Sequence, residues 1–217
     1  MKLVSVIIPT CNRYDVVLDN ANKIKQQDYP NIEIIICDDS MPQYRDTNNE
    51  NLNIIKSHFR YYYTARFDEH GNKLYGIAGA RNQGIVEAQG EYIVFFDDRI
   101  YPLNLNCISI FVEKLDSSKD KIWYFGNKGK EKISFVENFS AIRRNQIIDA
   151  GMFCERIDKY GAMTRELIAR YIHQGFTFQF VEEAKASFSV ESTDRERKSQ
   201  EIKIMREFLQ KLGYAKK

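Results

Sequence analysis

Two pairs of neighbouring aspartates, Asp38-Asp39 and Asp97-Asp98, each follow an apolar run in the first half of the chain. Taken alone, such a pair is typical of a turn or a helix cap. Two pairs at neighbouring strand ends would gather up to four carboxylates, whose like charges repel one another. A cation or a donor-rich ligand would compensate for that repulsion. A nucleotide with Mg²⁺ or Mn²⁺ meets this need, because both ions prefer hard oxygen ligands.

The elements that must position these side chains are three apolar runs, at residues 3–9, 32–37 and 91–96. Each run is short and apolar on both faces, as a buried parallel strand should be. The first run leads into the polar residues 10–13 (TCNR). Helical patterns separate the runs, and alternating strands and helices predict an α/β fold with a mostly parallel sheet. Ligands of such sheets bind beyond the carboxyl ends of the strands, where the acidic pairs lie.

Other elements follow from the same patterns. We expect Gly90 to be the C-cap that ends a helix over 78–89, and Pro102 to open the next helix. Thr193 and Glu196 match a capping box and predict a terminal amphipathic helix. The remaining expectations are helices at 14–27, 143–150 and 163–173 and strands at 59–63, 122–125, 133–136 and 176–181.

Composition narrows the class of protein. The 217 residues include 32 Lys and Arg against 30 Asp and Glu, a formal net charge of +2, which argues against a nucleic-acid partner. No run approaches ~18 apolar residues, so no transmembrane helix is expected, and the first residues do not match a signal peptide. Four scattered cysteines fit a reduced, cytoplasmic location. The basic terminal helix leaves peripheral contact at the inner face of the membrane open as an alternative to a solvated face.

Three segments together resemble family 2 glycosyltransferases of the GT-A fold. They occur in the family's order, and a weaker resemblance to its acceptor-side segment continues over 138–153. The three segments are residues 4–13 (VSVIIPTCNR), 34–40 (IIICDDS) and 79–98 (GARNQGIVEAQGEYIVFFDD).

The resemblance assigns roles at the first two strand ends. It implies that the turn containing Pro9, Thr10 and Asn12 holds a nucleoside together with Asp39. Asp39 would accept a hydrogen bond from a base N–H, and Asp38 is its neighbour in the motif. These five residues form the expected nucleoside site.

At the third strand end the resemblance places Arg81 near the nucleotide, with Asp97 and Asp98 at the ribose and the metal-bound diphosphate. A structural ion pair of Arg81 with one of these acids is the alternative. The family usually has a metal-ligating acid where this chain has Arg99. Asp98 could take over as the ligand of Mn²⁺ or Mg²⁺, Arg99 could itself neutralise the diphosphate, or Arg99 could point to solvent.

This chain also has other residues at the positions where the family usually carries its catalytic base. The family's acceptor helix usually begins Gly-x-Glu-Asp, whereas Gly161 and Ala162 are followed here by Met163 and Thr164. Glu166, one turn on, is the candidate base for the acceptor hydroxyl. An i,i+4 ion pair with Arg170 is its structural alternative.

The resemblance therefore implies one GT-A-like domain over 1–217, with a nucleotide-sugar half at 1–102 and an acceptor half at 103–217. The implied activity is the transfer of a sugar, with inversion at its anomeric carbon, from a nucleotide-sugar to a hydroxyl of a saccharide, lipid-linked glycan or protein. A UDP-sugar is the expected donor. A non-catalytic nucleotide-binding or partner protein on the same fold is the competing class, favoured by Arg99 and Met163-Thr164. A nucleotidyltransferase is a third, but no Gly-rich phosphate loop follows the first strand.

Overall fold

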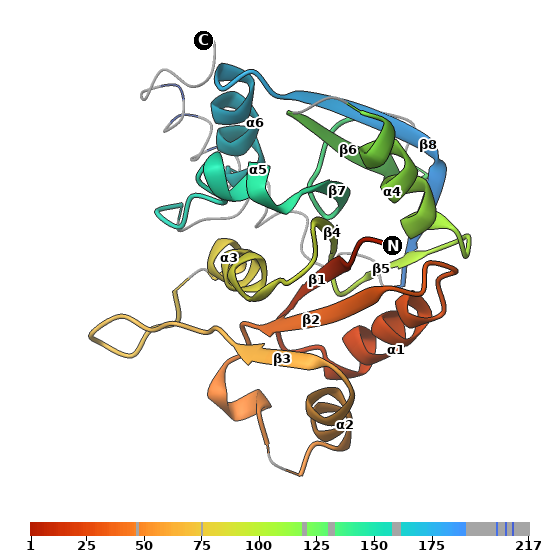
Figure 1. The fold of residues 1–217 in the computed structure, drawn as a ribbon. Helices are drawn as coiled ribbons and strands as arrows, with labels where there is room; N and C mark the ends of the chain where they lie inside the picture. Colours follow the sequence, from red (N-terminus) through yellow and green to blue (C-terminus); the bar gives the residue numbers. More distant parts are fainter. Residues whose placement is uncertain are drawn as a thin grey trace.

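The computed structural model describes residues 1–46, 48–74, 76–118, 121–129, 133–157 and 162–189, together with residues 203, 207 and 210. Within these ranges, helices cover both faces of a single eight-stranded sheet (Figure 1). The capping box at Thr193 and Glu196 and most of the expected terminal helix lie outside the described residues.

The first half alternates strands and helices as the patterns predict. Its elements are β1 (Val4–Thr10), α1 (Tyr14–Lys25), β2 (Ile32–Asp38), the 3₁₀ turn η1 (Pro42–Tyr44), α2 (Glu50–His58), β3 (Arg60–Tyr63), α3 (Ile77–Glu87) and β4 (Tyr92–Phe96).

The second half has shorter strands and a different rhythm. Its elements are β5 (Ile100–Pro102), α4 (Cys107–Ser117), β6 (Ile122–Asn127), β7 (Phe139–Arg143), α5 (Arg144–Asp149), α6 (Met163–His173) and β8 (Thr177–Phe188).

The strand order is β3-β2-β1-β4-β7-β6-β8-β5. Strands β3, β2, β1 and β4 are parallel, so their carboxyl ends lie at one edge. Strand β7 runs antiparallel to β4 and to β6, and it carries the sheet from the first half of the chain into the second. The expected α/β class with a mostly parallel, helix-flanked sheet is confirmed.

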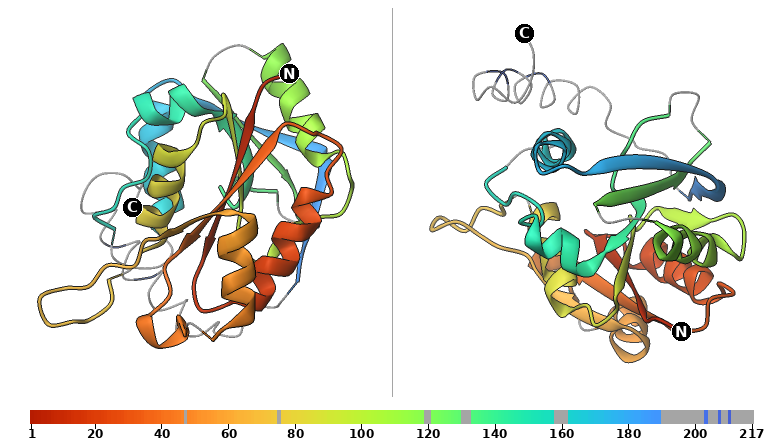
Figure 2. Two further views of the ribbon diagram at one scale, coloured as in Figure 1. Left: turned by 60° about the horizontal axis from the view of Figure 1, so that its bottom comes forward. Right: turned by 45° about the horizontal axis from the view of Figure 1, so that its top comes forward.

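Two apolar cores form on the two faces of the sheet. Successive side chains of β1 alternate between them: Val6 and Ile8 pack with α1, α2 and α4, whereas Ile7 packs with α3, α5 and α6. Figures 1 and 2 show α1 and α2 on one side of β1–β3 and α3 on the other. Because both faces are covered, the strand side chains are buried and the runs are continuously apolar.

Several expectations near the middle of the chain are wrong. Pro102 ends the edge strand β5 rather than opening a helix; an edge position tolerates its missing N–H. Residues 133–136 form no strand. Strand β7 was missed, because its five residues run directly into α5.

Gly90 is also not a left-handed C-cap. The C-cap of α3 is Ala88, in an extended conformation. A Cβ at Gly90 would lie 2.7 Å from both the Ser5 nitrogen and the Leu3 carbonyl oxygen. Glycine is therefore required there for the close approach of two backbones.

Candidate functional site

The acidic pairs meet at the carboxyl ends of β1, β2 and β4. Thr10, the last residue of β1, pairs in register with Asp38 of β2. On the other side of β1, its hydroxyl donates to the Asp98 carboxylate at 3.0 Å. The end of β1 therefore lies between the two pairs, as the parallel topology predicts.

Both carboxylate oxygens of Asp38 accept hydrogen bonds from other residues of the protein. Its carboxylate is fully buried and accepts hydrogen bonds from Tyr14 Oη, Tyr61 Oη and the Ser40 backbone N–H. The Arg45 guanidinium lies 3.6 Å away. These contacts join α1, β2 and β3, and a ligand contact for Asp38 stays a prediction.

Asp39 has one oxygen held and one without a partner. Lys73 Nζ donates to Oδ2 at 2.5 Å, while Oδ1 is buried with no hydrogen-bond partner among the described residues. Burial raises the pKa of Asp39, and the neighbouring Lys73 opposes that rise. A Cβ at Gly76 would lie 2.1 Å from Oδ1, so a glycine there leaves the oxygen room.

The turn after β1 is held in a specific shape. Asn12 has a left-handed backbone with φ 58°, its N–H donates to Ser40 Oγ at 2.7 Å, and its side-chain oxygen accepts from the Met41 N–H at 3.1 Å. Asparagine tolerates this conformation better than most residues. Pro9 and Thr10 are buried in β1, so Asn12 is the exposed member of the three predicted turn residues.

Asp98 forms an ion pair with Arg13. Arg13 Nε and Nη2 donate to its two oxygens at 2.8 and 2.9 Å, a bidentate arrangement, and Thr10 adds a third donor. Only 2% of its side chain is exposed. Burial raises the pKa of Asp98, and the Arg13 charge opposes that rise. Its role as a metal ligand stays a prediction.

Asp97 is the more accessible acid of its pair, with 20% of the side chain exposed. Arg81 Nη2 donates to its Oδ1 at 2.8 Å, and Asn138 Nδ2 donates to Oδ2 at 3.1 Å. Arg81 is buried, so the structural alternative of an ion pair with one of the acids is what the structure shows for it.

Arg81 also binds a carboxylate that the sequence patterns missed. Its Nη1 donates to Glu137 Oε1 at 2.6 Å, and Thr164 Oγ1 donates to Glu137 Oε2 at 2.7 Å. Met163 Sδ lies 3.7 Å from the same Arg81 nitrogen. The two residues at the expected base positions thus contact the Arg81–Glu137 pair.

Glu166 is buried and forms the i,i+4 ion pair that was its alternative. Arg170 Nε donates to it at 2.6 Å, and Arg170 also donates to the carbonyls of Ala150 and Met152. These contacts fix α6 to the turn after α5. A catalytic role for Glu166 stays a prediction.

The described carboxylates do not fit a preformed site for a divalent cation. Those of Asp97 and Asp98 are held by arginines, and the described residues include no group of three or more acidic, histidine or cysteine side chains placed to hold a metal. Arg99 is half-buried and forms no ion pair with any described residue. A role for Arg99 in place of a metal-ligating acid stays a prediction of the family resemblance.

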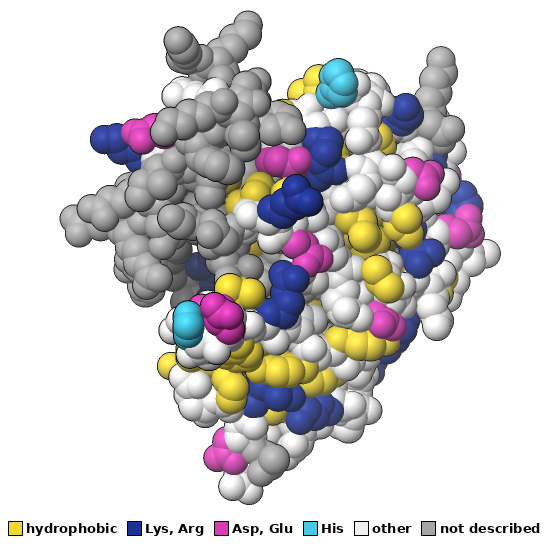
Figure 3. Space-filling model, turned by 90° about the vertical axis from the view of Figure 1, so that its left-hand side faces the viewer, with side chains coloured by type: hydrophobic (Ala, Val, Ile, Leu, Met, Phe, Trp, Pro, Cys, Tyr) yellow, Lys and Arg dark blue, Asp and Glu magenta, His cyan; other side chains and the backbone are white. Residues whose placement is uncertain are grey.

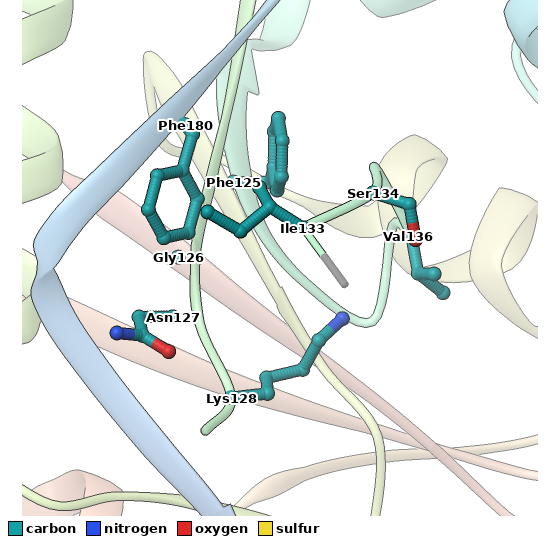
Figure 4. A pocket seen from close by; sticks show the side chains of 8 residues that line it. All are labelled: Phe125, Gly126, Asn127, Lys128, Ile133, Ser134, Val136 and Phe180. Atoms are coloured by element: carbon teal, nitrogen blue, oxygen red, sulfur yellow. The ribbon is translucent and has the colours of Figure 1, made fainter. Parts of the chain in front are cut away.

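A pocket opens beside this site in the second half of the chain. Phe125, Ile133 and Phe180 gather on one side of it, and Asn127 and Lys128 on the other (Figure 4). Lys128 Nζ donates to Asn138 Oδ1 at 2.6 Å, which connects the pocket wall to the Asn138–Asp97 contact.

One face of the molecule carries side chains of both charges. On the face shown in Figure 3, the coloured Lys and Arg side chains are interspersed with Asp and Glu. No helix within the described ranges combines the length and apolarity needed to cross a bilayer.

Solved structures define the class of fold. A mannosyltransferase from Pyrobaculum calidifontis, PcManGT, in complex with GDP-Man and Mn²⁺ aligns with a TM-score of 0.73 at 17% identity. It covers 99% of this chain and 65% of its own. GalNAc-T7 with UDP, GalNAc and Mn²⁺ aligns at 0.68 and 14%, over 87% of this chain and 44% of its own. The fold is GT-A.

The chain belongs to glycosyl transferase family 2, because a model of that family matches residues 5–133, more than half of the sequence. The Escherichia coli enzyme WfaP, a UDP-Glc:α-D-GlcNAc-diphosphoundecaprenol β-1,3-glucosyltransferase, is 38% identical over 101 residues, 46% of this chain and 37% of its own. A Campylobacter jejuni GalNAc(5)-diNAcBac-PP-undecaprenol β-1,3-glucosyltransferase is 33% identical over 99 residues, 45% and 30% respectively. The chain thus spans about a third of the length of these relatives.

Proposed function

We propose that this protein transfers a sugar from a UDP-sugar to an acceptor hydroxyl with inversion at the anomeric carbon. The observation that carries the proposal is the buried Oδ1 of Asp39 at the carboxyl end of β2, which has no hydrogen-bond partner among the described residues. A buried acceptor without a partner is costly. A nucleobase N–H would supply the missing hydrogen bond. Both curated relatives described above are named as glucosyltransferases, and the name of WfaP specifies UDP-Glc.

In this proposal the nucleoside lies against Asp39 and the turn containing Asn12, and the diphosphate extends towards Asp97. Arg99 meets the diphosphate charge, since it forms no ion pair with any described residue and the acids nearby are already held. Mn²⁺ or Mg²⁺ stays a prediction of the family resemblance, and no step is assigned to it. The pocket of Figure 4 lies in the half expected to bind the acceptor, a saccharide, lipid-linked glycan or protein.

The chemical step is a direct displacement. The acceptor oxygen forms a bond to the anomeric carbon as the bond from that carbon to the diphosphate breaks, and UDP leaves with the electron pair. The acceptor proton passes to a base within hydrogen-bond reach. Positive side chains near the diphosphate stabilise the charge that develops on the leaving group.

The test is the affinity of UDP measured by calorimetry. Asp39→Ala should weaken UDP binding by about 1–3 kcal/mol, the usual effect of losing a charge-assisted hydrogen bond. Asp149→Ala, at an exposed aspartate of α5, is the matched control and should bind as the wild type does. Equal affinity in Asp39→Ala and the wild type would refute the nucleoside site.

The second candidate is a nucleotide-binding protein without transferase activity. The ion pair of Glu166 with Arg170 favours it, because that pair occupies the only acid expected to serve as the base. Under this alternative the protein binds UDP but releases none from UDP-sugars with any of a broad panel of acceptors. Turnover of a UDP-sugar by the wild type would exclude it.

A further inference from the structure

Four side chains form a continuous polar chain between the end of β4 and the first turn of α6. Asp97 is bound to Arg81, Arg81 to Glu137, and Glu137 to Thr164, at 2.8, 2.6 and 2.7 Å. These four linked side chains therefore join the half of the protein expected to bind the nucleotide to the half expected to bind the acceptor.

Glu137 is the unusual member, because it lies just before β7 with only 4% of its side chain exposed. Burying a carboxylate is costly unless it is paired and hydrogen-bonded. Here each oxygen has a donor, one from the Arg81 guanidinium and one from Thr164. Glu137 is thus held in place, and it holds Arg81 in turn.

The charges of this group do not cancel. Two carboxylates share one guanidinium, so Asp97, Arg81 and Glu137 together carry a formal charge of −1. Arg81 and Glu137 are 1% and 4% exposed, whereas Asp97 is 20% exposed. Asp97 is therefore where a ligand meets the remaining negative charge.

We propose that Glu137 is a positioning residue of the donor site, acting through Arg81 to set the orientation and the charge of Asp97. Because Glu137 engages one guanidinium nitrogen, Arg81 presents the other to Asp97 without fully neutralising it. The bond to Thr164 fixes this arrangement to the start of α6. The proposal rests on the proposed function, which places a diphosphate near Asp97.

The test compares UDP binding by Glu137→Gln and wild type in EDTA at low salt. The substitution keeps the shape of the side chain and makes the group neutral. A polyanion should then bind more tightly, by about 3- to 10-fold, and the gain should shrink at high salt. A purely structural role for Glu137 predicts weaker binding instead.

Glu183→Gln is the matched control. Glu183 also lies near a basic side chain, Lys114, but 64% of its side chain is exposed, and it is not one of the four linked residues. The control substitution changes the net charge by the same amount, and UDP affinity should stay within about twofold of wild type. Glu137→Gln binding like this control, or more weakly than wild type, overturns the proposal.

Breaking a buried ion pair can prevent folding, so a double variant gives a second test. Arg81→Met with Glu137→Met replaces the pair by apolar side chains and leaves Asp97 facing the diphosphate without its arginine. UDP affinity in EDTA should fall at least about fivefold. Wild-type affinity in this variant would overturn the role of the pair. If the wild-type protein binds no UDP, the proposed function itself fails and the role of Glu137 with it.

Discussion

Asp38 and Asp39 are neighbours in the sequence, yet their carboxylates have different surroundings. Asp38 accepts hydrogen bonds from Tyr14, Tyr61 and the Ser40 N–H, whereas Asp39 keeps one oxygen without a partner among the described residues. Only the second arrangement leaves an acceptor for a ligand. Asp98 and Asp97 are both ion-paired with an arginine and differ instead in exposure, with 2% and 20% of the side chain exposed.

Arg99 directly follows Asp97 and Asp98 in the sequence, and the proposed function assigns it to the diphosphate. If its charge meets the diphosphate, Arg99→Asp should weaken UDP binding in EDTA by about tenfold or more, because a charge-assisted contact is replaced by repulsion. Mn²⁺ should then restore more affinity in the variant than it adds in the wild type, since a new carboxylate is a hard oxygen ligand.

Calorimetry with and without Mn²⁺ measures both effects. Arg156→Asp makes the same change of charge at an exposed arginine and should leave UDP affinity unchanged. An Arg99→Asp variant that binds UDP in EDTA as the wild type does would remove Arg99 from the donor site.

Glu166 has two interpretations that one substitution separates. Glu166→Gln weakens the ion pair with Arg170, so we expect the free energy of unfolding to fall by about 1–3 kcal/mol in urea denaturation. If Glu166 is also the base, kcat should fall about 10²- to 10⁴-fold with UDP affinity unchanged. A Glu166→Gln variant with the wild-type kcat would leave Glu166 only its structural role. Glu182→Gln, at an exposed position, is the control for both measurements.

At the scale of elements, α3 shows why glycine is required in the middle of a helix. A Cβ on Gly84 would lie 2.5 Å from Ile7 Cγ2 and 3.2 Å from Cys37 Sγ, so α3 packs directly against β1 and β2. Alanine favours helix by about 1 kcal/mol over glycine, but overpacking costs about 1–3 kcal/mol. Gly84→Ala should therefore lower stability on balance.

Gly79 supplies the control within the same helix. A Cβ there would lie 2.9 Å from Arg66 Nη2, the far end of a flexible side chain that can move. Gly79→Ala should be neutral or stabilising by about 0.5–1 kcal/mol. Equal effects of the two substitutions in thermal or urea denaturation would contradict the close packing of α3.

At the scale of the whole molecule, Glu33 links three strands and the end of α3. It accepts from Ser5 Oγ at 2.5 Å, from the Gln89 N–H at 2.7 Å and from Arg60. Burial acts to raise the pKa of Glu33, but these hydrogen bonds and the Arg60 charge outweigh it and lower that pKa.

A lowered carboxylate pKa stabilises the fold above the unfolded-state pKa, about 4.3 for Glu. That stabilisation is lost as the pH falls through the lower, folded-state pKa. We expect Glu33→Gln to reduce the loss of unfolding free energy between neutral and acid pH, measured by urea denaturation. Glu113→Gln, at an exposed position of α4, should keep the wild-type dependence, and an unchanged profile in Glu33→Gln would count against the linkage.

The elements that could be predicted from the sequence are those whose local pattern of apolar and polar residues matches their burial in the fold. Strands β1, β2 and β4 are apolar on both faces, and α6 begins and ends where its periodicity indicates. Strand β5 and the close contact at Gly90 could not be read in this way. Pro102 is allowed by an edge position, and Gly90 by the nearby backbone of β1, which are properties of distant residues.

The sequence by itself determined the α/β class, the family and the placing of acidic pairs at neighbouring strand ends, because local hydrophobic patterns and motif spacing specify these. Only the tertiary structure decided which carboxylate oxygens remain available. Glu137 reaches Arg81 across 56 positions of sequence, and Thr10 reaches Asp98 across 88. A hydrogen bond forms between groups that folding brings within about 3 Å, and no local pattern specifies which distant groups those will be.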